Sequence, residues 1–293
     1  MTSTTKPPRK NIAVYADGFA SVYMLRDILM RTFAHVDVDV VFVKHDQVAR
    51  GEFPNNNTIL FILPGTPKGS SLYREQLGQK GFTLIRQHIE RGMHYHGYCA
   101  GAYLAATEFG YFDQITGEQR EIVTPLPLVE GRAEGPVPYY AERTNQIDRE
   151  SGYAMARIAF TNAASLPDMA KIFYSAGPAL TLYKDAEGQY ETLARFLDVP
   201  EQPIAALRRT DLGLGTATLI SFAPEIIELE PKYIRPTHNP IYGESHKLLH
   251  KEMASGIDNR KRFFVTALAP VYATLREQEH KNRIRGLEHV IPT

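Results

Sequence analysis

The sequence predicts an α/β fold: a mostly parallel, doubly wound sheet with flanking helices, followed by antiparallel additions and C-terminal helices. Three observations predict it. Short apolar runs alternate with amphipathic segments through residues 11–98, which is typical of parallel strands joined by crossover helices. Short strand-like runs separated by turn residues then follow one another up to residue 222. Beyond residue 240, apolar side chains recur at helical spacing.

The first half is expected to place strand ends at one edge of the sheet. Strands are predicted at residues 11–16, 36–43, 58–63 and 93–98, and helices at residues 21–33 and 81–91. Val22, Leu25 and Ile28 recur at the spacing of one helix face, and Gly92 ends the second helix. Ligands of such sheets bind at the carboxyl ends of the strands.

The second half is expected to be antiparallel or mixed. Strands are predicted at residues 121–130, 154–160, 171–175 and 190–196, and a hairpin at residues 204–209 and 216–222. Residues 131–136 are predicted to form a loop, residues 258–278 a helix, and residues 276–285 a solvated tail. We expect residues 1–10 to be a disordered lead-in and residues 11–293 a single domain, with residues 240–293 as its helical extension.

Composition indicates a globular protein and excludes several kinds of partner. The 33 Lys and Arg residues balance the 33 Asp and Glu residues, so no net field favours nucleic acid or an anionic membrane. Residues 1–10 lack the apolar core of a secretory signal, and the single cysteine fits a reducing, cytoplasmic compartment. We expect a small-molecule substrate or ligand, with another protein as the alternative partner. No cofactor and no metal are expected.

The single cysteine, Cys99, lies in a pattern that predicts a nucleophile elbow. The string Gly97-Tyr98-Cys99-Ala100-Gly101 joins a strand-like run directly to a helix-like one. Small neighbours leave room for the strained backbone that such a turn requires. The helix N-terminus is expected to lower the pKa of the thiol. A buried, inert cysteine is the alternative interpretation.

Several strings follow one another along residues 11–230, and the most specific is Cys99-Ala100-Gly101-Ala102-Tyr103. The others are Leu63-Pro64-Gly65-Thr66, Gly81 with its helix, Val129-Glu130-Gly131-Arg132-Ala133-Glu134-Gly135-Pro136, Phe173-Tyr174-Ser175-Ala176-Gly177 and Phe222-Ala223-Pro224-Glu225. In this order they resemble the N-terminal domain of biotin-protein ligases, a branch of the class I glutamine amidotransferase-like superfamily. Nothing in the chain resembles the ligase's catalytic domain.

The resemblance implies a cysteine nucleophile, a histidine base and a glutamate that orients the histidine, the last two from a His-x-Glu string. This chain has Glu225 at the glutamate position but Ala223 at the histidine position. Alanine cannot accept a proton, so the implied triad lacks its central member. His238, in a loop beyond Glu225, is the first candidate to replace it, and a solvent-facing loop histidine is its alternative interpretation.

Other histidines have weaker claims to a role in chemistry. His94 and His96 alternate on a central strand, and His96 is either a distant base or a core histidine. His246 and His250 have a metal-compatible helical spacing, but an ordinary helix surface explains them better because no third ligand is apparent.

Four residues at strand ends complete the candidate site. Amides of Gly65, Thr66 and Ala100 are expected to form an oxyanion hole, with a plain proline-glycine turn as the alternative. Asp17, at the end of the first strand, is a candidate for tuning the thiol or a turn-forming residue.

These residues favour a cysteine-dependent hydrolase or amidotransferase-like protein that acts on a small carbonyl or amide substrate, with the standard histidine base missing. Two alternatives stay open. One is a non-catalytic domain that binds a ligand or a partner protein. The other is a thiol that senses oxidants or electrophiles.

Overall fold

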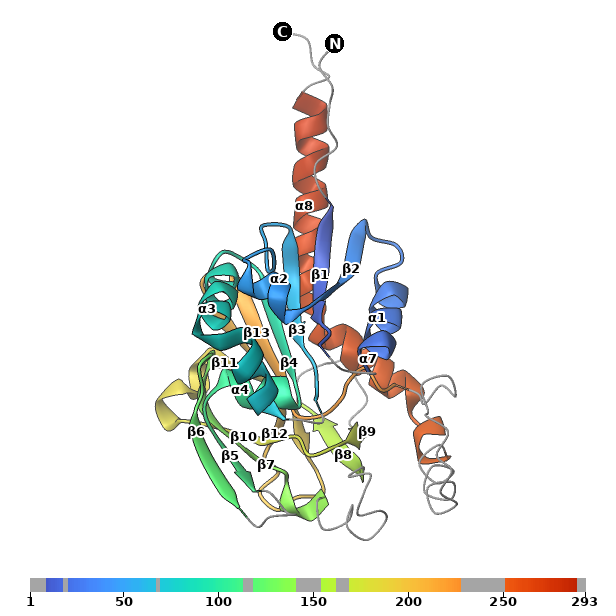
Figure 1. Ribbon diagram of the computed structural model, residues 1–293. Helices are drawn as coiled ribbons and strands as arrows, with labels where there is room; N and C mark the ends of the chain where they lie inside the picture. The colour runs from blue at the N-terminus through green and yellow to red at the C-terminus, as the bar shows by residue number, and fades with distance from the viewer. Residues whose placement is uncertain are drawn as a thin grey trace, which may run out of the picture.

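A single sheet of 13 strands organises the chain, with helices on both of its faces (Figure 1). The structure is a computed structural model, and it describes residues 9–17, 21–66, 69–112, 118–140, 154–161, 169–227 and 251–288. Most of the predicted lead-in lies outside these residues. Its last residue, Lys10, belongs to the first strand, which corrects the predicted boundary by one residue. The exposed Arg9 forms ion pairs with Asp37 and Asp39 beside that strand.

The strands along the chain include most of the predicted ones and several others. They are β1 Lys10–Tyr15, β2 Val38–Val43, β3 Thr58–Leu63, β4 His94–Tyr98, β5 Ala106–Phe112, β6 Gln119–Val123, β7 Val129–Gly135, β8 Ala154–Phe160, β9 Met169–Tyr174, β10 Ala179–Leu182, β11 Tyr190–Phe196, β12 Ile204–Leu212 and β13 Gly215–Ile220. The helices are α1 Ser21–Thr32, α2 His45–Ala49, α3 Ser70–Glu90, α4 Ala100–Ala105, α7 Ile257–Ala267 and α8 Ala269–Glu288, with the short 3-10 helix η1 at Lys184–Gln189.

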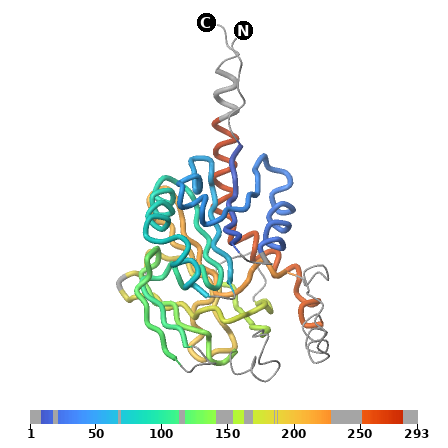
Figure 2. Tube along the Cα trace, in the orientation of Figure 1, coloured from blue at the N-terminus to red at the C-terminus, as the bar shows by residue number. Residues whose placement is uncertain are grey.

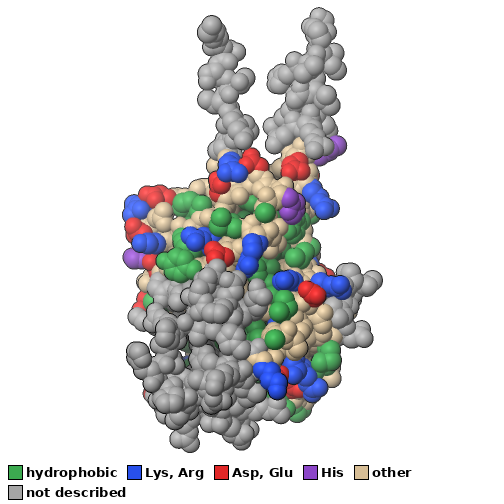
Figure 3. All heavy atoms as spheres, turned by 90° about the vertical axis from the view of Figure 1, so that its right-hand side faces the viewer, with side chains coloured by type: hydrophobic (Ala, Val, Ile, Leu, Met, Phe, Trp, Pro, Cys, Tyr) green, Lys and Arg blue, Asp and Glu red, His purple; other side chains and the backbone are tan. Residues whose placement is uncertain are grey.

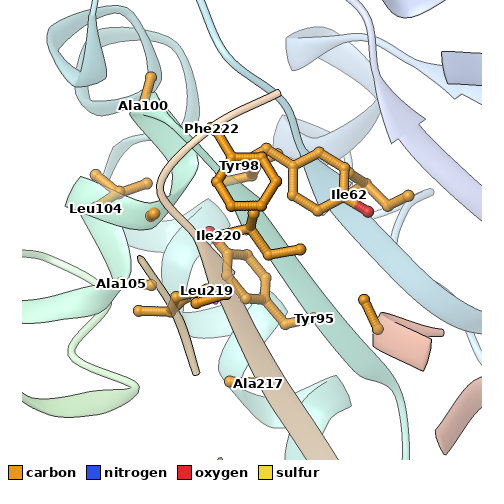
Figure 4. Packing of buried hydrophobic residues seen from close by; sticks show 14 of the residues in the cluster. Ile62, Tyr95, Tyr98, Ala100, Leu104, Ala105, Ala217, Leu219, Ile220 and Phe222 are labelled. Atoms are coloured by element: carbon orange, nitrogen blue, oxygen red, sulfur yellow. The ribbon is translucent and has the colours of Figure 1, made fainter. Parts of the chain in front are cut away.

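The central part of the sheet is parallel, as the sequence predicts. Strands β2, β1, β3, β4 and β13 lie side by side in that order, and each neighbouring pair is parallel. Helix α4 covers one face, where Tyr95 donates a hydrogen bond to the Gly101 carbonyl, and α8 covers the other, where His94 contacts Thr274. Apolar side chains from β3, β4 and β13 meet between these layers (Figure 4). The fold is therefore the predicted doubly wound α/β sheet.

The second half adds mostly antiparallel strands, with two corrections to the predicted elements. The strand predicted at residues 121–130 is divided, because β6 ends at Val123 and β7 begins at Val129. Residues 131–136, predicted as a loop, largely form the strand β7, in which every other residue is buried. Its glycines serve close packing instead of a turn, since a Cβ on Gly131 would lie 2.3 Å from the Thr181 carbonyl oxygen. Strands β5 and β10, which pair with β7, were not predicted.

The helices of the first half also differ from the predicted ones in length. Helix α3 begins at Ser70, eleven residues before the predicted start at residue 81, and Gly78 interrupts it with a φ of 56°. The elbow helix α4 has only 6 residues before the chain enters β5. Helix α1, in the first βα crossover, thus follows the prediction. Helix α4, after the elbow, is shorter than the apolar run of residues that begins it indicates.

The C-terminal helices extend the core. Phe263 of α7 stacks on Phe160 and tilts against Phe222, while Tyr272 of α8 stacks on Phe33 and donates a hydrogen bond to the Thr32 carbonyl. Helix α8 lies along β3 (Figure 2). It continues to Glu288, so the predicted solvated tail at residues 276–285 is helical. The beginning of the predicted extension, residues 240–250, lies outside the described residues.

The described surface carries charges of both signs. Lys, Arg, Asp and Glu side chains are interspersed over the face that Figure 3 presents. Among the described residues, no helix has the length and apolarity that a membrane crossing requires.

A buried polar contact joins the sheet to the C-terminal helices. The ring nitrogens of His94 lie 3.0 Å from the Thr216 hydroxyl and 2.9 Å from the Thr274 hydroxyl. Burial, and secondarily the charge of Arg208, lowers the pKa of His94 to about 4. The folded protein therefore holds His94 neutral, whereas the unfolded chain protonates it below pH 6.5.

We predict that acid weakens this contact. Because the unfolded state binds the extra proton, the free energy of unfolding falls as pH decreases from about 6.5 toward 4, by up to about 3 kcal/mol from His94 alone. Urea unfolding of His94→Asn should show lower stability at pH 7 but a shallower loss below pH 6.5. The exposed His45 serves as the control, and equal slopes for His94→Asn and His45→Asn would contradict the assignment.

Candidate functional site

The turn after β4 forms the elbow that the sequence predicts. Cys99 has a φ of 47° and a ψ of −102°, a conformation that non-glycine residues rarely adopt. Its amide donates a 2.8 Å hydrogen bond to the Ile220 carbonyl, and its own carbonyl accepts hydrogen bonds from Ala102 and Tyr103. The adjacent strand and the following helix therefore hold Cys99 in a strained turn.

Three glycines allow this turn to pack against the end of β3. A Cβ on Gly97 would lie 2.5 Å from the Gly101 carbonyl oxygen, and a Cβ on Gly101 would lie 2.1 Å from the Leu63 carbonyl oxygen. A Cβ on Gly65 would lie 3.3 Å from the Cβ of Cys99. The glycines in the sequence motif thus have a packing reason at this position.

The Cys99 thiol is partly buried and donates a hydrogen bond to the Ser175 carbonyl over 3.2 Å. Burial raises its pKa to about 12, the Ala100 amide opposes this effect, and the nearby Glu225 carboxyl adds to it. The expectation of a lowered thiol pKa was wrong. The helix has only 6 residues, and one of its amides stabilises the thiolate. This stabilisation is smaller than the free-energy cost of burying a thiolate in an apolar site.

Glu225 follows β13, the strand beside β4, and is 2% exposed. Burial raises its pKa to about 7, and its Oε2 atom has no hydrogen-bond partner among the described residues. Two positions earlier, Ala223 is partly exposed. The Glu225 carboxyl therefore raises the pKa of the Cys99 thiol, and the position of the histidine in the implied triad carries only a methyl group.

The histidines on β4 belong to the core. His96 is completely buried, and its Nδ1 lies 3.1 Å from the Tyr98 hydroxyl. Burial lowers the pKa of His96 well below its ordinary value, so the ring is neutral. With His94 joined to threonines, both histidines follow the core alternative. His238, His246 and His250 lie outside the described residues, and the described residues contain no group of three or more His, Cys, Asp or Glu suited to a metal ion.

The four predicted strand-end residues differ in what they contact. Gly65 lies against Cys99, Thr66 follows it, and the Ala100 amide is directed at the thiol. The Thr66 carbonyl accepts a hydrogen bond from the Gly69 amide, as in a turn. Asp17 accepts hydrogen bonds from the backbone amide and the ring of His45. This partner supports a structural role for Asp17 at the start of α2 rather than the predicted tuning of the thiol.

Three residues near the thiol were not predicted to belong to the site. Ser175 supplies the carbonyl that contacts Cys99, Ala176 has a φ of 53°, and Tyr103 donates a 3.0 Å hydrogen bond to the Ala176 carbonyl. The string 173–177 was part of the quoted resemblance, but only the folded chain brings β9 to the elbow. A backbone carbonyl has no signature in a sequence.

Comparisons with known proteins give one family. The sequence matches the family described as "Biotin-protein ligase, N terminal" over residues 10–291, so the match includes the C-terminal helices. An uncharacterized protein of Chlamydia muridarum is 25% identical over 234 residues, which cover 77% of this chain and 85% of that protein.

Two solved structures are similar in outline. One, titled a glutamine amidotransferase, has a TM-score of 0.43 at 16% identity and covers 83% of this chain and 98% of its own. The other, described as ThuA-like and from Bacteroides uniformis, has a TM-score of 0.47 at 12% identity and covers 91% of this chain and 93% of its own.

We predict that the buried carboxyl of Glu225 destabilises the fold at alkaline pH. Its pKa lies near 7 in the folded chain and 4.5 in the unfolded chain, so stability is full below pH 4.5 and declines as pH rises through 7. Glu225→Gln should therefore increase the free energy of unfolding at pH 8 by up to about 3 kcal/mol and change it little at pH 4.5. Urea unfolding at both pH values measures this. The exposed Glu75→Gln is the control, and a gain independent of pH would refute the assignment.

Proposed function

The chain belongs to the biotin-protein ligase N-terminal family, and from this premise we propose that it is an amidotransferase-like or hydrolytic protein in which Cys99 attacks a small carbonyl or amide substrate. One observation carries the proposal. Cys99 holds a backbone conformation that costs on the order of 1–3 kcal/mol, and strain of this kind persists where a side chain must be presented in one direction.

The surroundings of Cys99 fit an acyl-transfer step. The thiol loses its proton to an acceptor, a sulfur–carbon bond forms at the substrate carbonyl, and the leaving amine or alcohol takes up a proton. Water then hydrolyses the thioester and restores the thiol. The Ala100 amide and the backbone at Gly65 lie beside Cys99, where developing negative charge on the carbonyl oxygen needs hydrogen-bond donors.

The proton acceptor is the open part of this mechanism. Ala223 stands where the family pattern has histidine, and the core histidines are neutral and hydrogen-bonded elsewhere. His238 stays the candidate that the sequence offers. A second function is favoured by the same facts, because a site with a protonated thiol and an alanine in place of the base is suited to binding a small ligand without turnover. The high thiol pKa disfavours the sensor alternative, and it means that the catalytic function needs an acceptor for the thiol proton.

Turnover separates the two functions. We expect the purified chain to release ammonia or alcohol from at least one member of a panel of small amides and esters, and intact-mass measurement to detect an acyl adduct on Cys99. Cys99→Ala should abolish both signals, and His238→Ala should reduce the rate if that residue supplies the base. Saturable ligand binding with no adduct and no turnover would instead establish the binding function.

Placing an imidazole at position 223 tests whether the missing base limits the reactivity of Cys99. Ala223→His places a base at the partly exposed position where the family pattern has histidine, and general-base catalysis is worth about 10²–10⁴-fold. We expect faster acylation of Cys99 at pH 7 in this variant, measured by intact mass in samples quenched at successive times. Ala223→Asn, which adds a side chain of comparable size without a base, is the matched control. Equal acylation rates in the two variants would show that a base at position 223 does not accept the proton of the Cys99 thiol.

A further inference from the structure

The segment after β9 presents three consecutive backbone carbonyls to side chains of the core. The Ser175 carbonyl accepts the Cys99 thiol at 3.2 Å, the Ala176 carbonyl accepts the Tyr103 hydroxyl at 3.0 Å, and the Gly177 carbonyl accepts the Tyr174 hydroxyl at 2.6 Å. We call residues 175–177 the carbonyl segment. Its orientation is set from the protein interior, one hydrogen bond for each peptide unit.

The tyrosines that hold the carbonyl segment are themselves fixed. Tyr103 is 4% exposed and lies on the elbow helix α4, and Tyr174 is 1% exposed and also accepts a hydrogen bond from the Val137 amide. A Cβ on Gly135 would lie 2.2 Å from the Tyr103 hydroxyl, so β7 closes the other side of that contact. Neither hydroxyl is in a position to leave the segment without repacking.

The backbone of the carbonyl segment bears strain and lies close to the turn that precedes Glu225. Ala176 has a φ of 53°, a conformation that favours glycine. A Cβ on Gly177 would lie 1.5 Å from the Ser221 carbonyl oxygen, which is two residues before Ala223. The segment therefore contacts both the nucleophile and the chain that leads to the position of the missing base.

A carbonyl oxygen that accepts a hydrogen bond from the thiol stabilises the protonated form. A thiolate has no hydrogen to donate, and its negative charge would lie against the partial negative charge of that oxygen. We propose that Tyr103 is a positioning residue: by holding the Ala176 carbonyl it keeps the neighbouring Ser175 carbonyl on the thiol, and this contact adds to the burial that favours the protonated form of Cys99. This inference rests on the proposed function for its purpose, because the thiol must give up its hydrogen bond to the Ser175 carbonyl before its sulfur can attack a substrate. Its test, however, needs no substrate.

The test measures the ionisation of Cys99 by alkylation of the full chain. Rates of reaction with iodoacetamide are followed by intact mass from pH 6 to 10, and Cys99 is the only thiol in the sequence. This range lies below the midpoint of Cys99, where the rate is proportional to the thiolate fraction, so a shift of the midpoint is obtained from the ratio of the rates of two variants at the same pH. We expect Tyr103→Phe, which loses the hydrogen bond to the Ala176 carbonyl, to move the midpoint down by about one pH unit and to raise the rate at pH 8 about tenfold. Tyr272→Phe, which loses a similar bond to the distant Thr32 carbonyl, should match the wild type.

A second variant acts in the opposite direction. Ala176→Gly removes the strain at a positive φ, so it should hold the carbonyl segment in place more firmly, raise the melting temperature and slow alkylation about threefold. It also decides the matter if Tyr103→Phe does not fold. A faster reaction in Ala176→Gly, or a wild-type midpoint in a folded Tyr103→Phe, would overturn the proposal.

These outcomes are separate from those of the proposed function. A shifted midpoint in Tyr103→Phe, together with no turnover of any amide or ester, would refute catalysis and leave the positioning role established. Turnover with an unshifted midpoint would do the reverse.

Discussion

The site depends on the close crossing of the elbow over the end of β3. Gly101 lies so near the Leu63 carbonyl that no side chain fits between them, and Gly97 has the same relation to the Gly101 carbonyl. Because these backbones touch, Cys99 must leave β4 at a positive φ, and α4 must begin on the next residue. The partners of the thiol at Gly65, Ala100 and Ser175 follow from where this crossing places Cys99.

Burial explains the electrostatics of the site. It raises the pKa of both Cys99 and Glu225, so that the thiol and a large share of the carboxyl are protonated near neutral pH. In a triad, a histidine would accept the thiol proton and form a charged partner for the carboxylate. Ala223, at the histidine position of the family pattern, offers no such acceptor, and the Cys99 thiol stays protonated.

Elements with a strong local pattern were predictable, and those defined by packing were not. Strands β3 and β11 have the predicted bounds, because continuous or alternating apolar runs ended by turn residues determine them locally. Strand β7 was predicted as a loop because it is rich in glycine. Its glycines pack closely against Thr181 and Tyr103, and the sequence does not reveal these neighbours. The short α4 ends at β5 for a similar reason, since β5 pairs with β7.

The sequence by itself determined the doubly wound fold, the elbow, the family resemblance and the absence of histidine at position 223, because each of these is written in residue types and their spacing. Only the tertiary structure decided the state of the thiol. Burial of the thiol and the carboxyl of Glu225, which lies far from Cys99 in the chain, reverse the lowering of the thiol pKa expected from the helix N-terminus. Ionisation depends on the whole surrounding volume, which forms only when the sheet is complete.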